Sequence, residues 1–214
     1  MSAPRILVVI GHPLPGSLNH ALAANYAKEA REAGAAVDII DLATDPRPGH
    51  PEAHADLQAP RDAGDPALTP VVADYVERVR AADHIAFFFP QWWGTYPAVL
   101  AEWLNRVILA GESFSYRNKG KGWDKLLTGR TARITMTMDS PSAWNRLMYR
   151  DAAIRTLKTA TLWYVGIKTI DVTRVAEVRA STLAKRDKAI ATAGGQGRAD
   201  AALTPALRES RVSA

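Results

Sequence analysis

The sequence predicts a doubly wound α/β fold, in which helices cover a parallel β-sheet. Residues 6–10 (ILVVI) and 85–89 (IAFFF) form short, uninterrupted apolar runs, as strands buried on both faces do. Segments with a helical spacing of apolar residues lie between the predicted strands. Strands that alternate with helices form βαβ units, whose right-handed connections produce a parallel sheet. We expect five such strands.

The first predicted βαβ unit begins with the strand at 6–10. A loop follows it, and then a helix at 18–33 whose apolar positions repeat with helical spacing. Gly34 follows that helix, and glycine is common directly after helix C-termini. The second strand is predicted at residues 37–42, which completes a strand, helix and strand in the order that a parallel sheet requires.

A long segment at residues 44–70 has no clear period and is rich in proline. Loops of that length in compact domains are usually functional or mobile. His50 and His54 lie four positions apart there, with Asp56 nearby, but the prolines argue against a helix that would align the two rings. Because a closed metal site needs more ligands in a fixed geometry, the pattern disfavours a metal.

The middle of the chain carries the most distinctive stretch. A helix predicted at 71–81 leads into the strand at 85–89, and Pro90 ends that strand because it has no N–H to donate. Two adjacent tryptophans follow in a loop, at the carboxyl end of a buried strand, where open α/β sheets bind ligands. Pro97 suits the first turn of the next helix. Trp103 lies on the apolar face of that helix and is expected in the core.

The C-terminal half completes the predicted sheet. After a basic, glycine-containing loop come a strand at 131–138, a helix within 143–160, an edge strand at 167–175 and a helix at 181–193. Residues 194–214 are rich in glycine, alanine and polar residues, which predicts a flexible tail after one domain at 1–193.

The composition indicates a globular protein of a reducing compartment. The chain has 214 residues, of which 47% are hydrophobic and 23% charged, and it contains no cysteine. Disulfides, thiolate nucleophiles and cysteine-bound metals are therefore excluded. No apolar run approaches the roughly 20 residues that span a bilayer. The first predicted strand starts too early to leave room for a signal peptide, so we expect a cytoplasmic protein.

The net charge of +5 has two interpretations. The basic segments lack the interleaved aromatic residues or the helix-turn-helix pattern of nucleic-acid binding, so we expect no nucleic acid as a partner. A solvated basic surface, with some positive charge available to an anionic cofactor, is favoured instead.

The loop after the first strand comes close to a phosphate-binding motif. Gly11 and Gly16 have the spacing of G-x-x-x-x-G-K-[ST], but Ser17 stands where the lysine is needed, which argues against nucleotide hydrolysis. The serine hydroxyl, backbone N–H groups and a helix N-terminus can still hold a phosphate, although a tight turn with a capping serine gives the same pattern. Neither G-x-G-x-x-G nor G-x-S-x-G is present, so a Rossmann dinucleotide site and a hydrolase nucleophile elbow are disfavoured.

Two motifs, taken together, resemble those of a known family. They are His12-Pro13-x-x-Gly16-Ser17-Leu18-Asn19 and Phe89-Pro90-Gln91-Trp92-Trp93-x-x-x-Pro97-Ala98-x-Leu100. This combination looks like the NAD(P)H:quinone oxidoreductases, flavodoxin-like flavoproteins that include the modulator-of-drug-activity and potassium-efflux ancillary types. The resemblance extends over most of the chain. It implies five parallel strands in the order 2-1-3-4-5, a flavin (FMN or FAD) bound at their carboxyl ends, NAD(P)H as electron donor, and a homodimer.

The resemblance also implies roles for single residues. The flavin phosphate would be held by Ser17, Leu18 and Asn19, with His12 beside them. The isoalloxazine ring would be lined by Pro90, Gln91, Trp92, Trp93 and Gly94, and a third loop would consist of Thr137, Met138, Asp139 and Ser140. Well-known members carry a Gly-Gly pair in the third loop, and Met138-Asp139 cannot offer the same close backbone approach. Tyr96 and Trp144 are the candidates to stack a quinone or nicotinamide on the exposed ring face. Trp163 and Tyr164 are expected to be core or interface aromatics.

The leading hypothesis is an enzyme in which NAD(P)H reduces the flavin and a quinone or similar acceptor then takes the electrons. Because the cofactor carries the difficult chemistry, a catalytic triad is not needed. One alternative is a one-electron flavin carrier, but such carriers usually present an acidic face, and the net charge is +5. The other alternative is a regulatory module that docks on a partner such as a cation-efflux system, since a fold alone does not imply a function.

Overall fold

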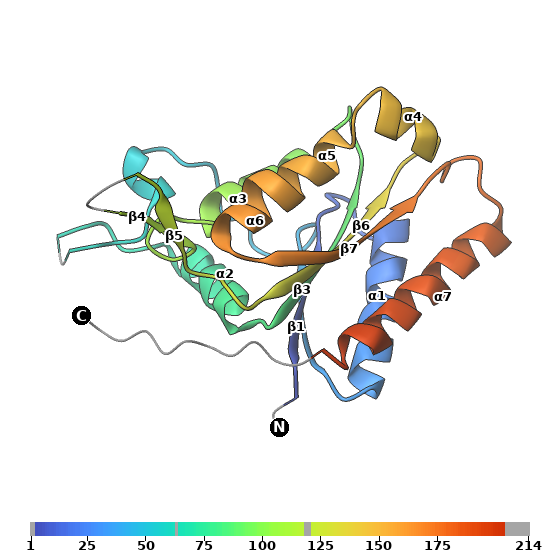
Figure 1. The fold of residues 1–214 in the computed structure, drawn as a ribbon, viewed down its shortest axis with the longest axis horizontal. Helices are drawn as coiled ribbons and strands as arrows, with labels where there is room; N and C mark the ends of the chain where they lie inside the picture. The colour runs from blue at the N-terminus through green and yellow to red at the C-terminus, as the bar shows by residue number, and fades with distance from the viewer. Residues whose placement is uncertain (1–2, 63, 118–120, 204–214) are drawn as a thin grey trace.

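The computed structural model describes residues 3–62, 64–117 and 121–203, and its centre is a parallel β-sheet (Figure 1). Its four strand pairs are all parallel, and the strand order is β2-β1-β3-β6-β7. Counted among themselves, these strands have the order 2-1-3-4-5, so the predicted five-stranded parallel sheet is confirmed. The strands are β1 (Arg5–Ile10), β2 (Ala36–Asp41), β3 (His84–Pro90), β6 (Thr131–Thr137) and β7 (Lys168–Val175).

Side chains of β1 alternate between two packing clusters. Leu7 and Val9 pack with α2 and α3, and Trp103 of α3 is 1% exposed, as predicted for a core residue. Ile6 and Val8 pack with α1 and α7 instead, and Figure 1 shows these two helices side by side. The continuous apolar run of β1 is explained by this alternation, since both sets of side chains are covered. The bounds of these helices are α1 (Leu18–Glu32), α2 (Pro70–Ala81), α3 (Ala98–Val107) and α7 (Leu183–Asp200).

The proline-rich segment at 44–70 is anchored to α3 by two ion pairs. Arg47 pairs with Glu102, whose side chain is 4% exposed. Arg106 lies 3.1 Å from Asp56, which belongs to the short 3₁₀ helix η1 (His54–Leu57). The carboxylate predicted to lie near two histidines is therefore already engaged. Within the described ranges, no group of three or more His, Cys, Asp or Glu side chains could hold a metal ion.

The region predicted to hold one helix within 143–160 is broken into two parts. α4 (Ser142–Leu147) ends before Arg150 and Asp151, which have positive φ angles of 51° and 52°. Two consecutive residues in this left-handed conformation cannot continue a right-handed helix. A second helical run then follows without a gap, and it consists of α5 (Ala152–Arg155), the π-helix η2 (Thr156–Leu162) and α6 (Trp163–Val165).

A small antiparallel hairpin occupies part of the segment that the sequence predicts as a loop. Its strands are β4 (Phe114–Tyr116) and β5 (Trp123–Lys125). The ring of Trp123 stacks on Tyr164 with a centroid distance of 4.3 Å, and its indole N–H donates to the Tyr164 carbonyl oxygen at 2.8 Å. The strands are too short to show a period in the sequence, and in the structure they pack against α6.

The last helix is longer than predicted, because α7 continues to Asp200. Residues 194–200, which the sequence predicts as the start of a flexible tail, are helical instead. Where α7 crosses α1, a Cβ atom on Gly197 would lie 2.2 Å from the carbonyl oxygen of Tyr26, so glycine is what permits the close approach. Residues 204–214, also in the predicted tail, lie outside the described residues. None of the helices in the described ranges is long and apolar enough to cross a membrane.

Candidate functional site

The loops after β1 and β3 lie together at the carboxyl edge of the sheet. Pro90 at the end of β3 pairs with Thr137 at the end of β6, and the N–H of Gly11 donates to the carbonyl oxygen of Phe88 at 2.8 Å. A Cβ atom on Gly11 would lie 2.8 Å from the side chain of Leu100. Glycine therefore avoids crowding at the point where the first loop leaves the sheet.

The first turn of α1 has no side-chain cap. Ser17 is the N-cap residue, but its hydroxyl makes no hydrogen bond to the helix amides and lies 2.7 Å from Nδ1 of His20 instead. The first backbone bonds to the Ser17 carbonyl oxygen come from His20 and Ala21. The amides of Leu18 and Asn19, at the positive end of the helix dipole, are thus placed to bind an anion. The predicted phosphate residues come together here.

Asn19 connects this turn to β6. Its side chain is buried, with 2% exposure, and its amide donates to the hydroxyl of Thr137 at 2.9 Å. Its side-chain carbonyl oxygen has no hydrogen-bond donor among the described residues. A buried acceptor without a donor lowers the stability of the fold. The Asn19 oxygen lies in the same uncapped first turn of α1.

Ser17, His20 and Asp41 form a hydrogen-bonded series that the sequence interpretation missed. Nε2 of His20 lies 3.1 Å from Oδ1 of Asp41 at the end of β2. The series has the residue types of a nucleophile triad, but its serine stands at a helix N-terminus that suits an anion. Its effect is to orient the serine hydroxyl. The spacing of Ser17 and His20 was a usable signal, whereas the proximity of Asp41 follows from β2 pairing with β1.

The loop after β3 is a tight turn that presents both tryptophans. Trp92 and Thr95 exchange backbone hydrogen bonds of 2.8 and 2.9 Å, while Trp93 and Gly94 have φ angles of 48° and 77°. Two positive φ angles at the centre are the mark of a type I′ turn. Trp93 is fully exposed and Trp92 is 41% exposed. The ring of His12 meets Trp92 edge-on, with centroids 5.7 Å apart, so the first two predicted loops are in contact.

Two of the predicted residues are partly withdrawn from solvent. Burial lowers the pKa of His12, so its imidazole is neutral near pH 7, and the N–H of Leu14 donates to its Nδ1 at 3.0 Å. Tyr96 packs edge-on against Phe89, with centroids 6.0 Å apart, and burial raises the pKa of its hydroxyl. The Tyr96 ring is thus half-buried, and its stacking on a quinone or nicotinamide stays a prediction.

Gln91 connects the aromatic loop to α4 through a buried asparagine. Its side-chain amide donates to Asn145, which has 0% exposure, and the hydroxyl of Ser140 donates to its side-chain oxygen at 3.4 Å. Asn145 donates to Asp151 at 2.5 Å, and Arg174 of β7 holds Asp151 with bonds of 3.0 and 2.8 Å. The sequence interpretation missed Asn145, Asp151 and Arg174, because no local pattern joins residues from three separate elements.

The third loop makes hydrogen bonds to the end of β7 and the segment that follows it. Met138 is buried, its N–H donates to Val175 at 2.9 Å, and its carbonyl oxygen accepts from Val178 at 3.1 Å. The carboxylate of Asp139 accepts from the N–H of Arg179 at 2.8 Å. Both residues therefore hold the segment that follows β7. Met138 and Asp139 thus join the ends of β6 and β7, and their contact with a flavin stays a prediction.

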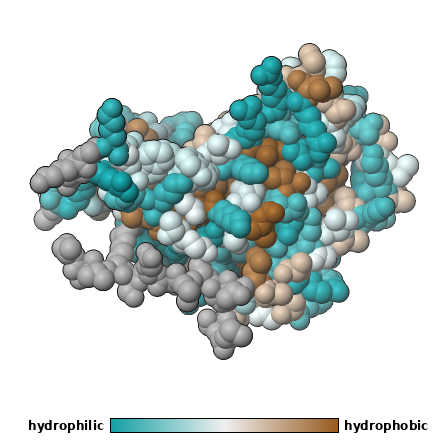
Figure 2. All heavy atoms as spheres, viewed as in Figure 1, coloured by the Kyte–Doolittle hydropathy of each residue, from teal (hydrophilic) through white to brown (hydrophobic). Residues whose placement is uncertain are grey.

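α4 adds an exposed apolar surface beside the aromatic loop. Trp144 is 50% exposed, and Leu147 and Met148 are 76% and 60% exposed. The ring of Tyr149 lies over Gly94, because a Cβ atom on that glycine would be 3.5 Å from it. In Figure 2, hydrophobic residues in brown gather over α4 at the top of the view. Trp144 is therefore placed near the aromatic loop, as its predicted stacking role requires.

Comparison with known proteins agrees with this arrangement. Residues 4–197 match a family model described as a flavodoxin-like fold. A ribosyldihydronicotinamide dehydrogenase-like protein of Penicillium crustosum is 32% identical over 152 residues, which cover 63% of this chain and 57% of that protein. The ribosyldihydronicotinamide dehydrogenase [quinone] of Mus musculus is 27% identical over 150 residues, which cover 64% of each. The chain thus spans less than two thirds of these relatives.

A solved structure shares the fold over nearly the whole chain. It is an FMN-dependent NADH-azoreductase from Bacillus anthracis in complex with FMN, which superposes with a TM-score of 0.72 at 17% identity and covers 92% of this chain and 97% of its own. At that identity the similarity concerns the fold.

Proposed function

The chain belongs to the family with the flavodoxin-like fold, and on this basis we propose that it binds a flavin, FMN or FAD, and oxidises NAD(P)H. The proposed electron acceptor is a quinone or a similar small molecule. The observation that carries the proposal is the uncapped first turn of α1 beside the exposed ring of Trp92. Together they supply an anion cradle and a flat aromatic wall, which are the two parts that a flavin phosphate and a flavin ring need.

Each part of the site has a proposed task. The amides of Leu18 and Asn19, with the hydroxyl of Ser17, would bind the flavin phosphate. Trp92 would line the ring, and Trp144 would cover the exposed face where the nicotinamide and the acceptor bind in turn. A bound flavin supplies the hydride and electron transfer, so the side chains of this protein orient the reactants and exclude water.

We also propose that the working unit is a homodimer. The apolar side chains of Trp93, Leu147 and Met148 are exposed at the rim of the site, and exposed apolar surface of this kind marks an interaction site. A second subunit would cover them and close the flavin slot. Sedimentation equilibrium that gives only the monomer mass would contradict this assembly.

The function is tested by the absorption spectrum and the extracted cofactor of the purified protein. We expect a yellow protein, or one that becomes yellow when FMN or FAD is added, and oxidation of NADH or NADPH that speeds up when 1,4-benzoquinone is present. A colourless protein that takes up neither flavin and oxidises neither nucleotide would contradict the proposal. If the nucleotide is oxidised but the quinone does not change the rate, the result would support flavin binding and contradict the proposal that a quinone is the acceptor.

The substitution His20→Ala is expected to weaken FMN binding about tenfold, because a hydrogen bond to a charged group contributes about 1.5–3 kcal/mol. When Nε2–H of His20 donates to Asp41 and Nδ1–H donates to the Ser17 oxygen, at 2.7 Å, the hydroxyl proton of Ser17 is free to donate to the phosphate. Riboflavin has the same ring but no phosphate, so its affinity should stay unchanged. Both affinities are measured by quenching of flavin fluorescence.

The matched control for this measurement is His54→Ala, which removes an exposed imidazole from the proline-rich segment. It should leave both affinities as they are. Equal loss of FMN and riboflavin binding in His20→Ala would mean that His20 supports the fold of the loop in general, and it would reject the specific role at the phosphate.

A further inference from the structure

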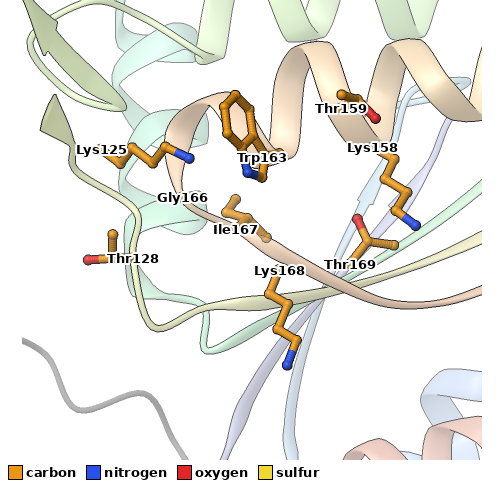
Figure 3. Close-up of a pocket in the computed structure, with 9 residues that line it drawn as sticks. All are labelled: Lys125, Thr128, Lys158, Thr159, Trp163, Gly166, Ile167, Lys168 and Thr169. Carbon is orange, nitrogen blue, oxygen red and sulfur yellow. The ribbon is translucent and has the colours of Figure 1, made fainter. Parts of the chain in front are cut away.

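A second cavity lies away from the flavin loops, where β7 begins. It has a volume of about 440 Å³, and its walls come from the hairpin, from the helical run η2–α6 and from the first residues of β7 (Figure 3). Because the five strands are parallel, the start of β7 is a full strand length from the carboxyl edge. For the eight residues of β7 this is roughly 25 Å, at about 3.3 Å per residue. A molecule in this cavity would not touch a flavin at the carboxyl edge.

The charged residues that line the cavity are all lysines. Lys125, Lys158 and Lys168 contribute to its walls, and no carboxylate is among the lining residues. Within the part of the chain that the structure describes, none of the three forms an ion pair, whereas Lys185 on the surface of α7 pairs with Glu177 at 3.4 Å. Ammonium groups at the edges of a cavity that has no carboxylate among its lining residues produce a positive potential there. The cavity therefore favours an anion.

The remaining walls suit a flat apolar group. Trp163 is 55% exposed, and the Nζ atom of Lys125 lies 3.5 Å from the centroid of its ring. Figure 3 shows Lys125 turned toward Trp163, with Ile167 between these two residues and Lys168. The cation–π contact holds the ammonium group in place, so the position of the charge is fixed before a ligand arrives. An apolar wall with one fixed charge recognises an amphipathic anion better than a small inorganic one.

The helical geometry of one wall supports a binding role. Lys158 and Thr159 belong to η2, which is a π-helix over seven residues. π-Helices are rare and occur frequently at functional sites. Gly166, directly after α6, has a φ of 102°, and a Cβ atom there would lie 2.9 Å from Thr128 on the opposite wall. The two walls are thus held close together by a glycine that no other residue could replace without strain.

We propose that this cavity is a second small-molecule site, for a planar aromatic molecule that carries one anionic group. The anionic group lies at Lys125, and the aromatic part extends along Trp163 and Ile167 toward Lys158. The site is separate from the flavin loops and does not depend on the proposed oxidoreductase activity.

The test is isothermal titration of the FMN-saturated protein with 2-naphthoate as the probe. Two further titrations use 2-naphthol, which has the ring without the charge, and inorganic phosphate, which has the charge without the ring. We expect 2-naphthoate to bind at least tenfold more tightly than 2-naphthol or phosphate. We also expect its affinity to fall as the salt concentration rises, because salt screens exposed charges. In the double variant Lys125→Gln and Lys158→Gln, binding should fall by at least tenfold, and Trp163→Ala should weaken it as well.

The matched control is Lys28→Gln, which neutralises a lysine on α1 that pairs with Glu29 and Glu32. It should bind 2-naphthoate as the unmodified protein does. The single variant Lys158→Gln changes an exposed helical position, so it should fold normally even if the double variant does not. It should show part of the loss of 2-naphthoate affinity. Absence of binding, equal binding in the double variant, or displacement of 2-naphthoate by added FMN in the flavin-free protein would each overturn the proposal.

Discussion

Asp200→Ala is expected to lower the free energy of unfolding by about 3–5 kcal/mol, because breaking a buried ion pair leaves an uncompensated charge inside. Asp200 is 1% exposed at the end of α7. It accepts two bonds from Arg133, at 2.7 and 2.8 Å, and one from the hydroxyl of Tyr26 at 2.7 Å, and Nε2 of His84 lies 3.2 Å away. Arg133 keeps its contact with Asp171 in the variant, which places the expected loss at the lower end of that range.

Urea unfolding followed by circular dichroism measures this change. The matched control is Asp187→Ala, which removes an exposed carboxylate from the same helix and should change the unfolding free energy by less than about 0.5 kcal/mol. Equal stability of the two variants would mean that the end of α7 does not hold the sheet and that its buried cluster contributes nothing.

The contribution of Asp200 depends on pH. Burial alone would raise the pKa of Asp200, but hydrogen bonds from Arg133, His84 and Tyr26 outweigh burial and hold it well below the usual range. A carboxyl group whose pKa is depressed in the folded state stabilises that state above the unfolded pKa of about 3.9. This stabilisation is lost as the pH falls through the folded pKa. The difference between the unmodified protein and Asp200→Ala should therefore narrow below about pH 4.

Two glycines of α7, two positions apart, are expected to respond to alanine in opposite directions. A Cβ atom on Gly197 would lie 2.2 Å from the carbonyl oxygen of Tyr26, and a Cβ atom on Gly195 would meet nothing within 4 Å. Gly197→Ala should lower the unfolding free energy by about 1–3 kcal/mol, since overpacking against backbone forces the helices apart. Gly195→Ala should raise it by up to about 1 kcal/mol, because alanine is the better helix former.

Thermal and urea unfolding of both variants decide between these outcomes. Each variant is the control for the other, because the substitution, the helix and the added methyl group are the same. If Gly197→Ala is as stable as Gly195→Ala, then α7 does not pack against α1 at the observed distance. The anchoring of Asp200 to Tyr26 would then lose its support as well.

The central sheet could be predicted because its signals are local. Residues 6–10 and 85–89 are apolar without interruption, and this composition is stable only where helices cover the strand. The prolines and glycines that end β1 and β3 mark the loops, and strand order then brings those loops to one edge. The loop before Ser17 and the loop that carries Trp92 and Trp93 were predicted on this basis, and both follow the carboxyl ends of neighbouring strands.

Other parts of the site are decided by contacts between distant segments. Asn145 is buried, and its hydrogen-bond partners Gln91 and Asp151 both lie outside α4. Met138 and Asp139 are turned toward the segment after β7 by backbone bonds that no local pattern encodes. A hydrogen bond between residues far apart in the chain leaves no period and no motif, so single-sequence reasoning has nothing to detect.

The fold class, the five strands and the two loops at the carboxyl edge could be predicted from local patterns, because apolar runs and turn residues are visible in short stretches of sequence. The helix at residues 194–200 depends instead on tertiary packing. The glycines and alanines of this segment predict a flexible tail when only the local sequence is considered, since glycine weakens an isolated helix. Packed against α1, Gly194 and Gly197 permit an approach that larger side chains would prevent, and Asp200 at the end of that helix meets Arg133 of β6. The gain from close packing and a buried ion pair outweighs a poor local propensity.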